Sequence, residues 1–475
     1  MRALVHILCS AVFFIAGVMS ISDANAAPTP EQIDKIFDQW DRTNTPGCAL
    51  AVIQDGEIVY TRGYGMANLE HGVPISSESV FYVCSVSKQF TAMCIALLAE
   101  QGKLSLDDNI RKFLPEIPEY GRPITIRNLI YHTSGIRDYF ILWELAGRDY
   151  TDSMLEEEVF DILSRQKGLN FTPGEQYSYS NSGYFLLSVI IKRISGKSLR
   201  EFAEENIFKP LGMRHTHFHD DNTFIVKNLA NGHIPRQDGN WGLLTFRFAL
   251  VGSGGLHTSV EDMYLWDQNF YHNRLGKGGQ GLIDLTLTRG NLNDGKALNY
   301  AFGLEIGEYR GLKTVRHSGS LGGYRSHLLR FPGERFSVII LCNLSSINPG
   351  ALVEKLADLY LADHLAPAET LQKSSVRSRD TTGTTQKTGT TILSPEQLAE
   401  YAGEYYSDEL QTTYRFFIED STLCFRIRSN PKKRLDTMGK DTFSGIMFER
   451  DTNGRISGFK LDSGIIKNIE FVKKI

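Results

Sequence analysis

The segment Ser85-Val86-Ser87-Lys88 places a hydroxyl and an amine three residues apart. Apolar residues then recur at steps of three and four, which predicts a helix that begins near this segment. Positions i and i+3 share one face of a helix, so the Lys88 amine can reach the Ser85 hydroxyl. A serine hydroxyl is a poor nucleophile until a base takes its proton, and a partly desolvated lysine can be tuned to that task. We therefore predict Ser85 as a nucleophile and Lys88 as its partner in proton transfer.

The same spacing occurs a second time, in Ser429-Asn430-Pro431-Lys432. This copy lies among short strand patterns, and its proline is typical of a turn rather than of a helix interior. We interpret it as a chance match. The predicted helix and two further motifs support the first copy as the catalytic one.

The second motif is Tyr179-Ser180-Asn181. A phenol beside a lysine ammonium ionises more easily than in water, so Tyr179 is a candidate general base and later proton donor. Asn181 offers an amide that can orient both substrate and lysine. A Pro-Gly turn precedes the motif and a helical pattern over 184–194 follows it, which places it on a short, anchored loop. A similar triplet at 271–273 lacks this setting.

The third motif is His317-Ser318-Gly319, followed by Ser320, which we expect in a strand lining the site. A glycine there would let the substrate backbone approach closely. The backbone N–H of Ser320 could join that of Ser85 in an oxyanion hole. These four residues, with Asn181, are the predicted substrate-binding set. For His317 taken alone, the alternative is a structural histidine with satisfied hydrogen bonds.

These motifs, in this order, resemble those of the β-lactamase-related serine hydrolases, the group of class C β-lactamases, D-alanyl-D-alanine carboxypeptidases, D-aminopeptidases and related esterases. The resemblance covers residues 30–365 and includes further segments at 126–135, 210–213 and 254–258. It implies an acyl-enzyme reaction in which Ser85 is the nucleophile and Lys88 and Tyr179 transfer protons. Which of those two is the base in acylation stays open. One departure is His317, which stands where lactamases usually have the lysine of Lys-Thr-Gly.

The resemblance favours a serine hydrolase that acts on esters or on D-amino-acid amides and peptides, and the N-terminal pattern described below indicates that it is exported. The first alternative is a D-alanyl-D-alanine carboxypeptidase or a β-lactamase, which would use the same chemistry on another substrate. The second is a penicillin-binding sensor or a catalytically inert interaction module, because a fold alone does not guarantee activity.

Four segments organise the chain. Residues 1–26 contain one arginine, a continuous apolar stretch and Ala24-Asn25-Ala26, which predicts a cleaved signal peptide and export to a bacterial periplasm or the medium. Residues 27–370 form the hydrolase domain. Residues 371–392 are almost entirely Ser, Thr, Gly and charged residues, typical of a flexible linker. Residues 393–475 form a small second domain, and we expect few contacts between the two domains.

The expected fold class is α+β with an appended all-β domain. Apolar runs at 49–53 and 58–60 flank a turn, and another apolar run lies at 338–341, so one antiparallel sheet should draw strands from both ends of the hydrolase domain. The family resemblance implies that helices flank this sheet and that an all-α lobe accompanies it. Regularly spaced short strands after residue 400 predict a small barrel-like domain.

The composition excludes some partners. Net charge is −4, so no basic surface indicates nucleic acid, and no later segment predicts stable membrane insertion after signal cleavage. His215, His217 and His219 alternate and could line one face of a strand, but we interpret them as packed or exposed side chains and expect no metal and no cofactor. The expected partner is a small-molecule or peptide acyl substrate. Oligomeric state is left open.

Overall fold

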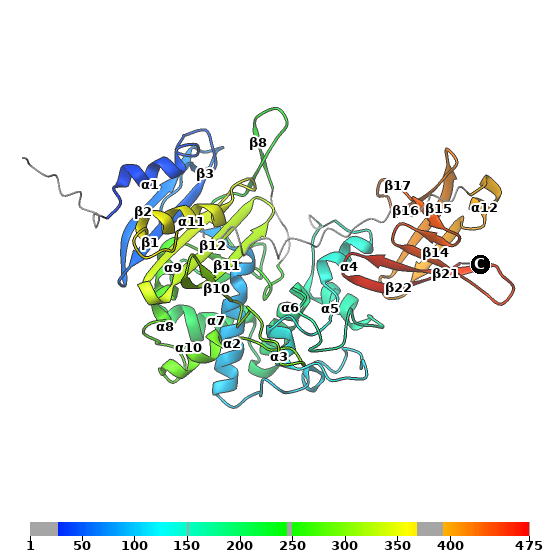
Figure 1. The fold of residues 1–475 in the computed structure, drawn as a ribbon, viewed down its shortest axis with the longest axis horizontal. Coiled ribbons are helices and arrows are strands. Elements are labelled where there is room, and N and C mark those ends of the chain that lie inside the picture. Colours follow the sequence, from blue (N-terminus) through cyan, green and yellow to red (C-terminus); the bar gives the residue numbers. More distant parts are fainter. Residues whose placement is uncertain (1–26, 150–151, 245–248, 368–392, 475) are drawn as a thin grey trace, which may run out of the picture.

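The computed structural model describes residues 27–149, 152–244, 249–367 and 393–474. The predicted signal peptide and linker lie outside these ranges. The chain forms a larger body of helices and strands and a smaller all-β body beside it (Figure 1). Within the described ranges, no helix combines the length and the apolar character needed to cross a bilayer.

A six-stranded antiparallel sheet forms the frame of the larger body. Its strand order is β10-β11-β12-β13-β1-β2, so strands from the two ends of the domain pair at its centre, as predicted. The bounds are β1 Cys48–Gln54, β2 Glu57–Tyr64, β10 Glu305–Tyr309, β11 Leu312–Leu321, β12 Tyr324–Phe331 and β13 Phe336–Cys342. Asp55 and Gly56, both with positive φ, form the tight turn of the β1–β2 hairpin.

The central strands β1 and β13 are apolar except for Gln54 and Ser337, because helices cover both faces of the sheet. Alternate side chains such as Leu50 and Ile340 pack under α1 Pro30–Phe37 and α11 Pro349–Tyr360. Those between them, such as Ala51 and Ile339, belong to the larger core that holds α2 and α9. The alternation follows from the two-residue period of a strand.

The helical lobe is built around α2 Lys88–Glu100, which is buried along nearly its whole length. It packs against α6 Asn181–Ser195, which ends at Gly196 in the left-handed conformation. The other helices are α3 Ile126–Ile130, α4 Tyr139–Leu145, α5 Glu156–Ser164, α7 Leu199–Ala203, α8 Lys209–Leu211, α9 Val260–Asn269 and α10 Gln280–Leu287, with single turns at Cys84–Ser87 (η1), Ile110–Lys112 (η2), Glu204–Phe208 (η3) and Pro332–Glu334 (η4).

Short strands join the lobe to the sheet. A three-stranded sheet has the order β5-β9-β6, with bounds Phe81–Tyr82, Leu256–Thr258 and His217–Phe218. Two small hairpins pair β3 Met66–Asn68 with β4 Val73–Pro74 and β7 His233–Pro235 with β8 Trp241–Leu243. The strand β5 leads directly into η1, and β9 follows the loop that ends at Gly255. This small sheet therefore supports the segment that carries Ser85.

The C-terminal body is a nine-stranded antiparallel sheet that curls into a half-barrel, in agreement with the predicted barrel-like domain. An aromatic cluster that includes Tyr405, Phe416 and Phe459 fills its interior. Helix α12 Pro395–Ala399 precedes the strands, whose bounds are β14 Gly403–Ser407, β15 Thr412–Glu419, β16 Thr422–Ile427, β17 Lys433–Arg434, β18 Thr437–Gly439, β19 Thr442–Phe443, β20 Ile446–Arg450, β21 Ile456–Ser463 and β22 Ile466–Lys473.

The two bodies touch closely, and the expectation of few contacts between them is wrong. The half-barrel stands against α4 and α5 of the lobe (Figure 1). Tyr414 donates a hydrogen bond to the carbonyl of Leu145 at 2.9 Å, and Arg137 forms a buried ion pair with Glu409 at 2.6 Å. The polar linker gave no sign of this interface, because the groups that form it lie far from the linker in sequence.

Candidate active site

Ser85 lies on the η1 turn between β5 and α2. The residue before it, Cys84, has φ of 52°, a left-handed conformation that is uncommon outside glycine and that makes the chain turn sharply at the nucleophile. The turn is tied in place by Ser87, whose hydroxyl donates to the Cys84 carbonyl and accepts from the Leu256 N–H. Ser85 itself keeps partial exposure, which a nucleophile needs.

Lys88 is fully buried at the first turn of α2, as the spacing predicted. Its Nζ donates to the Ser85 hydroxyl at 3.2 Å, to Asn181 Oδ1 at 2.9 Å and to the Ser253 carbonyl at 2.7 Å. Burial lowers the pKa of Lys88 to about 7, although the nearby Asp138 carboxylate opposes the shift. The amine is therefore partly neutral at pH 7 and can accept a proton from Ser85.

Asn181 is held by Asp138, a residue that the sequence analysis missed. The Asn181 N–H and its side-chain amide both donate to Asp138 Oδ2, at 2.6 and 3.0 Å. This leaves the amide oxygen of Asn181 facing Lys88 in a fixed orientation. Asp138 also caps α4 by accepting from the Phe140 N–H, and that local pattern was its only signal in the sequence.

Tyr179 borders the same amine. The Lys88 Nζ lies 4.7 Å from the centre of the Tyr179 ring, in cation–π range when the amine is protonated. Burial raises the pKa of Tyr179, and a hydrogen bond with Ser85 only partly opposes it. The expectation of an easily ionised phenol is therefore wrong, because enclosure disfavours the phenolate. At pH 7 this side chain is a neutral hydroxyl that can relay a proton.

His317 is buried and neutral. Its Nδ1–H donates to the Ser318 carbonyl at 2.7 Å, so Nε2 is the acceptor for the Tyr300 hydroxyl at 3.1 Å. Burial and the proximity of Lys88 lower its pKa to about 3. No cation therefore stands at this position at neutral pH. The ring of His132, another buried side chain, packs against Tyr179 with 4.3 Å between the ring centres, and it also packs against Tyr300.

Strand β11 lies directly against the turn that carries Ser85. A Cβ added at Gly319 would lie 2.3 Å from the Val83 carbonyl oxygen, so only glycine fits there. We expected the substrate backbone to approach this glycine closely. The protein's own backbone makes the close approach instead. Ser318 and Ser320 alternate with Gly319 and are exposed on the other face, where substrate could reach them.

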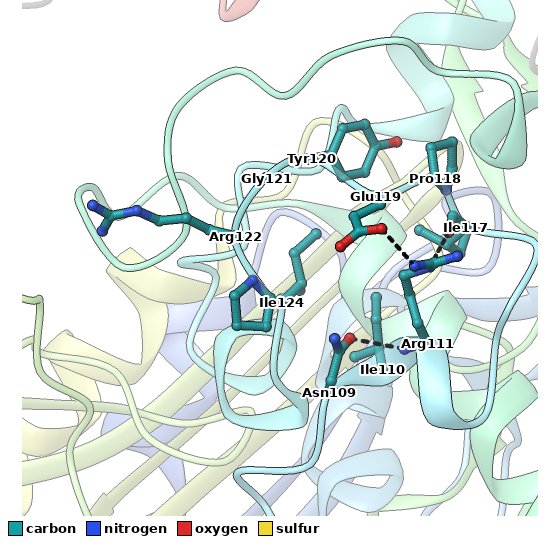
Figure 2. A pocket seen from close by; sticks show the side chains of 11 residues that line it. Asn109, Ile110, Arg111, Ile117, Pro118, Glu119, Tyr120, Gly121, Arg122 and Ile124 are labelled. Carbon is teal, nitrogen blue, oxygen red and sulfur yellow. Dashed lines mark hydrogen bonds and ion pairs between the residues drawn. The ribbon is translucent and has the colours of Figure 1, made fainter.

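A pocket of about 670 Å³ begins at Ser320. The tip of the β11–β12 hairpin, with Leu321 and Arg325, forms one wall, and Phe140 and Trp143 of α4 form another. Apolar and charged side chains share this lining. A smaller pocket of about 80 Å³ lies in the lobe around Arg111, whose guanidinium pairs with Glu119 (Figure 2). Neither pocket is lined by Ser85, Lys88 or Tyr179; the first is linked to the site through Ser320 of β11.

The other sequence matches play no part in this site. Ser429 and Lys432 lie on an exposed turn of the half-barrel, where Lys432 pairs with Glu419. Residues 271–273 follow the end of α9, and the Lys-Thr-Gly at 387–389 lies outside the described residues. The structure thus brings together Ser85, Lys88, Tyr179, Asn181 and His317, and adds Asp138, Tyr300 and the Ser253 carbonyl, for which no motif existed. The roles predicted for Ser318 and Ser320 in substrate binding stay predictions.

Comparison with known proteins agrees with this geometry. The family model described as Beta-lactamase matches residues 33–363. A D-aminopeptidase of Brucella anthropi is 33% identical over 307 residues, which are 63% of this chain and 56% of that protein, so the chain spans little more than half the length of that relative. Penicillin-binding protein 4* of Bacillus subtilis is 31% identical over 314 residues, 62% of this chain and 68% of that protein.

Solved structures extend the likeness to both bodies. The octameric penicillin-binding protein homologue from Pyrococcus abyssi superposes with a TM-score of 0.60 at 25% identity, over 90% of this chain and 96% of that one. The penicillin-binding protein from Bacillus halodurans gives 0.59 at 25% identity, over 69% and 99%. The chain therefore belongs to the β-lactamase and penicillin-binding-protein family of serine hydrolases.

Proposed function

We propose that this protein is a hydrolase that works through a covalent acyl-enzyme on Ser85, with Lys88 as the base in acylation. The observation that carries the proposal is the fully buried Lys88 amine, 3.2 Å from the Ser85 hydroxyl, with a pKa of about 7. A base with a pKa near the working pH combines a large neutral fraction with enough basicity to take the proton.

The proposed reaction has two halves. Ser85 Oγ attacks the substrate carbonyl carbon while its proton passes to Lys88 Nζ, and the N–H groups of Ser85 and Ser320 stabilise the oxyanion. Tyr179 donates its hydroxyl proton to the leaving nitrogen or oxygen as that bond breaks, and regains a proton from Lys88. In the second half Lys88 or Tyr179 takes a proton from a water as it attacks the acyl carbonyl carbon, and a proton is returned to Ser85 Oγ as the acyl C–O bond breaks, which releases the acid and restores the Ser85 hydroxyl.

Asp138 and Asn181 position the base in this scheme. The Asn181 amide fixes the Lys88 amine, and Asp138 fixes the amide, so the lone pair of the neutral amine is directed by partners that do not react. Asp138 also keeps the pKa of Lys88 from falling further than burial alone would take it.

For the substrate, we propose amides or short peptides of D-amino acids together with short-chain esters. The similarity to a protein named D-aminopeptidase supports a D-amino acid as the acyl part of the substrate. The neutral His317 supports a substrate without a carboxylate at the position where a lactamase lysine would stand. The pocket at Ser320 has the rings of Phe140 and Trp143 beside its charged residues, and these rings can pack against an uncharged side chain. We further propose that residues 1–26 direct export, since their pattern is that of a cleaved signal peptide.

One observation favours a second candidate. Arg325 lies in the same pocket as Ser320 and could bind the carboxylate of a D-alanyl-D-alanine peptide or a β-lactam. Its guanidinium already donates to the carbonyls of Gly322 and Tyr324, which holds it at the hairpin tip.

The test is a substrate panel under one set of conditions. We would measure kcat/KM at pH 7.5 for the p-nitroanilides of D-alanine and L-alanine, p-nitrophenyl acetate, a D-alanyl-D-alanine peptide and nitrocefin, beside covalent labelling by a fluorophosphonate. Faster turnover of the D-anilide than of its L-isomer and of nitrocefin supports the proposal. Preference for the peptide or nitrocefin favours the second candidate, and labelling without turnover of any substrate contradicts both.

A further inference from the structure

Three histidines converge on the small sheet behind the nucleophile. His217 belongs to β6, His219 follows that strand, and His257 belongs to β9. One ring nitrogen of each can be chosen so that all three lie within 4.8 Å of one another. The sequence had singled out His215 with His217 and His219, but His257 comes from another strand and His215 is not a member of the cluster.

Strand geometry explains the convergence. His217 and His257 are directly opposite each other in the antiparallel register of β6 and β9, so their rings lie on one face. His219 is two residues beyond His217 and therefore projects from the same face. We propose that these three imidazoles form a binding site for one divalent transition-metal ion of the zinc class, which clamps β6 to β9.

The distances fit such an ion. Two nitrogens bound to one tetrahedral Zn²⁺ at 2.0–2.1 Å lie roughly 3.3–3.4 Å apart. His217 Nε2 and His219 Nδ1 already stand 3.2 Å apart, so small ring rotations complete the set. His257 Nδ1 lies 3.4 Å from the Gly255 carbonyl, and a carbonyl that accepts from one ring nitrogen directs the lone pair of the other toward a metal.

All three rings are half-buried, and a neutral imidazole nitrogen is the form that binds a metal. Burial is the main cause that lowers the pKa of each of the three, to about 4 for His217 and about 3 for His257. Arg200 adds positive charge nearby, but it pairs with Asp220 at 3.3 Å, and Asp221 supplies a second carboxylate near His219. The two carboxylates thus offset the repulsion that Arg200 would exert on a bound cation.

The clamp would act on the frame of the active site. Tyr82 is the register partner of His257 on the other side of β9, and its ring packs 5.4 Å from that of His257. Tyr82 is followed two residues later by the strained Cys84 and then by Ser85. A bound ion would thus stiffen the strands from which the nucleophile turn emerges, without contacting substrate.

The test uses the full chain without a histidine tag, freed of metal by chelator. Zn²⁺ is titrated against a chromophoric chelator, and Co²⁺ is added separately to record its visible spectrum. We expect one equivalent to bind, an intense tetrahedral Co²⁺ spectrum, and a higher Tm with Zn²⁺ than without it. Loss of a residue that only hydrogen-bonds to a metal ligand weakens metal binding ~10–100-fold. His217→Asn and His219→Asn remove a ligand itself, so each should weaken Zn²⁺ binding by at least that factor.

His215→Asn is the matched control and should bind as the wild type does, because His215 lies outside the cluster. Circular dichroism of each variant checks that it is folded. If one ligand variant does not fold, the other still tests the proposal. Absence of stoichiometric Zn²⁺ binding by the wild type, or unchanged affinity in both folded ligand variants, would overturn the proposal. The outcome does not depend on which substrate the enzyme hydrolyses.

Discussion

Arg137 and Glu409 form an ion pair 2.6 Å long that joins the lobe to the half-barrel, and each side chain is no more than 2% exposed. The next residue after Arg137 is Asp138, the carboxylate that holds Asn181 against Lys88. Glu409 also accepts from the Lys167 N–H, and Arg137 donates to the Lys467 carbonyl, so both charges have further partners. The C-terminal body is thereby connected to the catalytic base through consecutive residues of one segment.

Removal of the charge at 409 should destabilise the protein. Glu409→Gln leaves the Arg137 guanidinium buried without its counter-charge, and breaking such a pair costs about 3–5 kcal/mol. We expect a loss of this size in the free energy of unfolding, measured with denaturant. We also expect a lower kcat, because displacement of Arg137 would shift the adjacent Asp138, which positions Asn181.

The control for this prediction is the exposed inter-body pair of Lys167 and Glu470, which is 3.6 Å long with both side chains about half exposed. Glu470→Gln should cost less than about 1 kcal/mol. Equal losses in the two variants would show that burial of the Arg137 pair has no special effect.

Ser85→Ala should abolish turnover and fluorophosphonate labelling while the protein stays folded. Loss of a covalent nucleophile costs on the order of a million-fold in kcat in a well-studied serine protease. Ser429→Ala, in the second Ser-x-x-Lys match, should leave both readouts unchanged because that serine lies on an exposed turn. More than trace activity in Ser85→Ala would mean that another residue is the nucleophile.

The pH dependence should follow Lys88. Only the neutral amine can accept a proton, so kcat/KM should fall about tenfold per pH unit below the Lys88 pKa of about 7 and level off above it. Asp138 raises that pKa by its negative charge, so Asp138→Asn should move the acid limb to lower pH. Glu175→Gln, on an exposed carboxylate, is the control. A limb that moves upward in Asp138→Asn, or does not move, would contradict the assignment of Lys88 as the base.

Selectivity should depend on the charge at position 317. A short-chain p-nitrophenyl ester should be hydrolysed faster than nitrocefin at pH 7.5, because the neutral His317 cannot pair with a lactam carboxylate. A hydrogen bond to a charged partner is worth roughly 1.5–3 kcal/mol, about ten- to a hundred-fold in selectivity. His317→Lys should gain lactam acylation, and the neutral His317→Gln should not. Faster nitrocefin hydrolysis by the wild type would refute the preference.

Limited proteolysis should cut the chain between Ser374 and Thr391, where the sequence is polar and Val376 is the single apolar residue. The contacts around Arg137 and Tyr414 should then hold the two fragments together, so they should co-elute in size-exclusion chromatography. Separation of the fragments in Glu409→Gln, but not in Glu470→Gln, would identify the buried pair as the main link. Separation of wild-type fragments would show that the interface is too weak to persist alone.

The sequence by itself determined the local features of the molecule. The Ser85–Lys88 spacing on a helix start, the Asp55-Gly56 hairpin and the end of α6 at Gly196 all follow from short-range periodicity and turn chemistry. The apolar run that became β13 was predictable for the same reason, since a strand buried on both faces needs no polar residue.

Only the tertiary structure decided the electrostatics of the site and the contacts between distant segments. The pKa of Lys88 depends on complete burial and on Asp138, which is 50 residues away in the chain. The same holds for His257 beside His217 and for Glu409 beside Arg137. Burial and Coulomb interactions depend on distance in space, and a polar residue with no local pattern gives no sign of the partner that folding will bring to it.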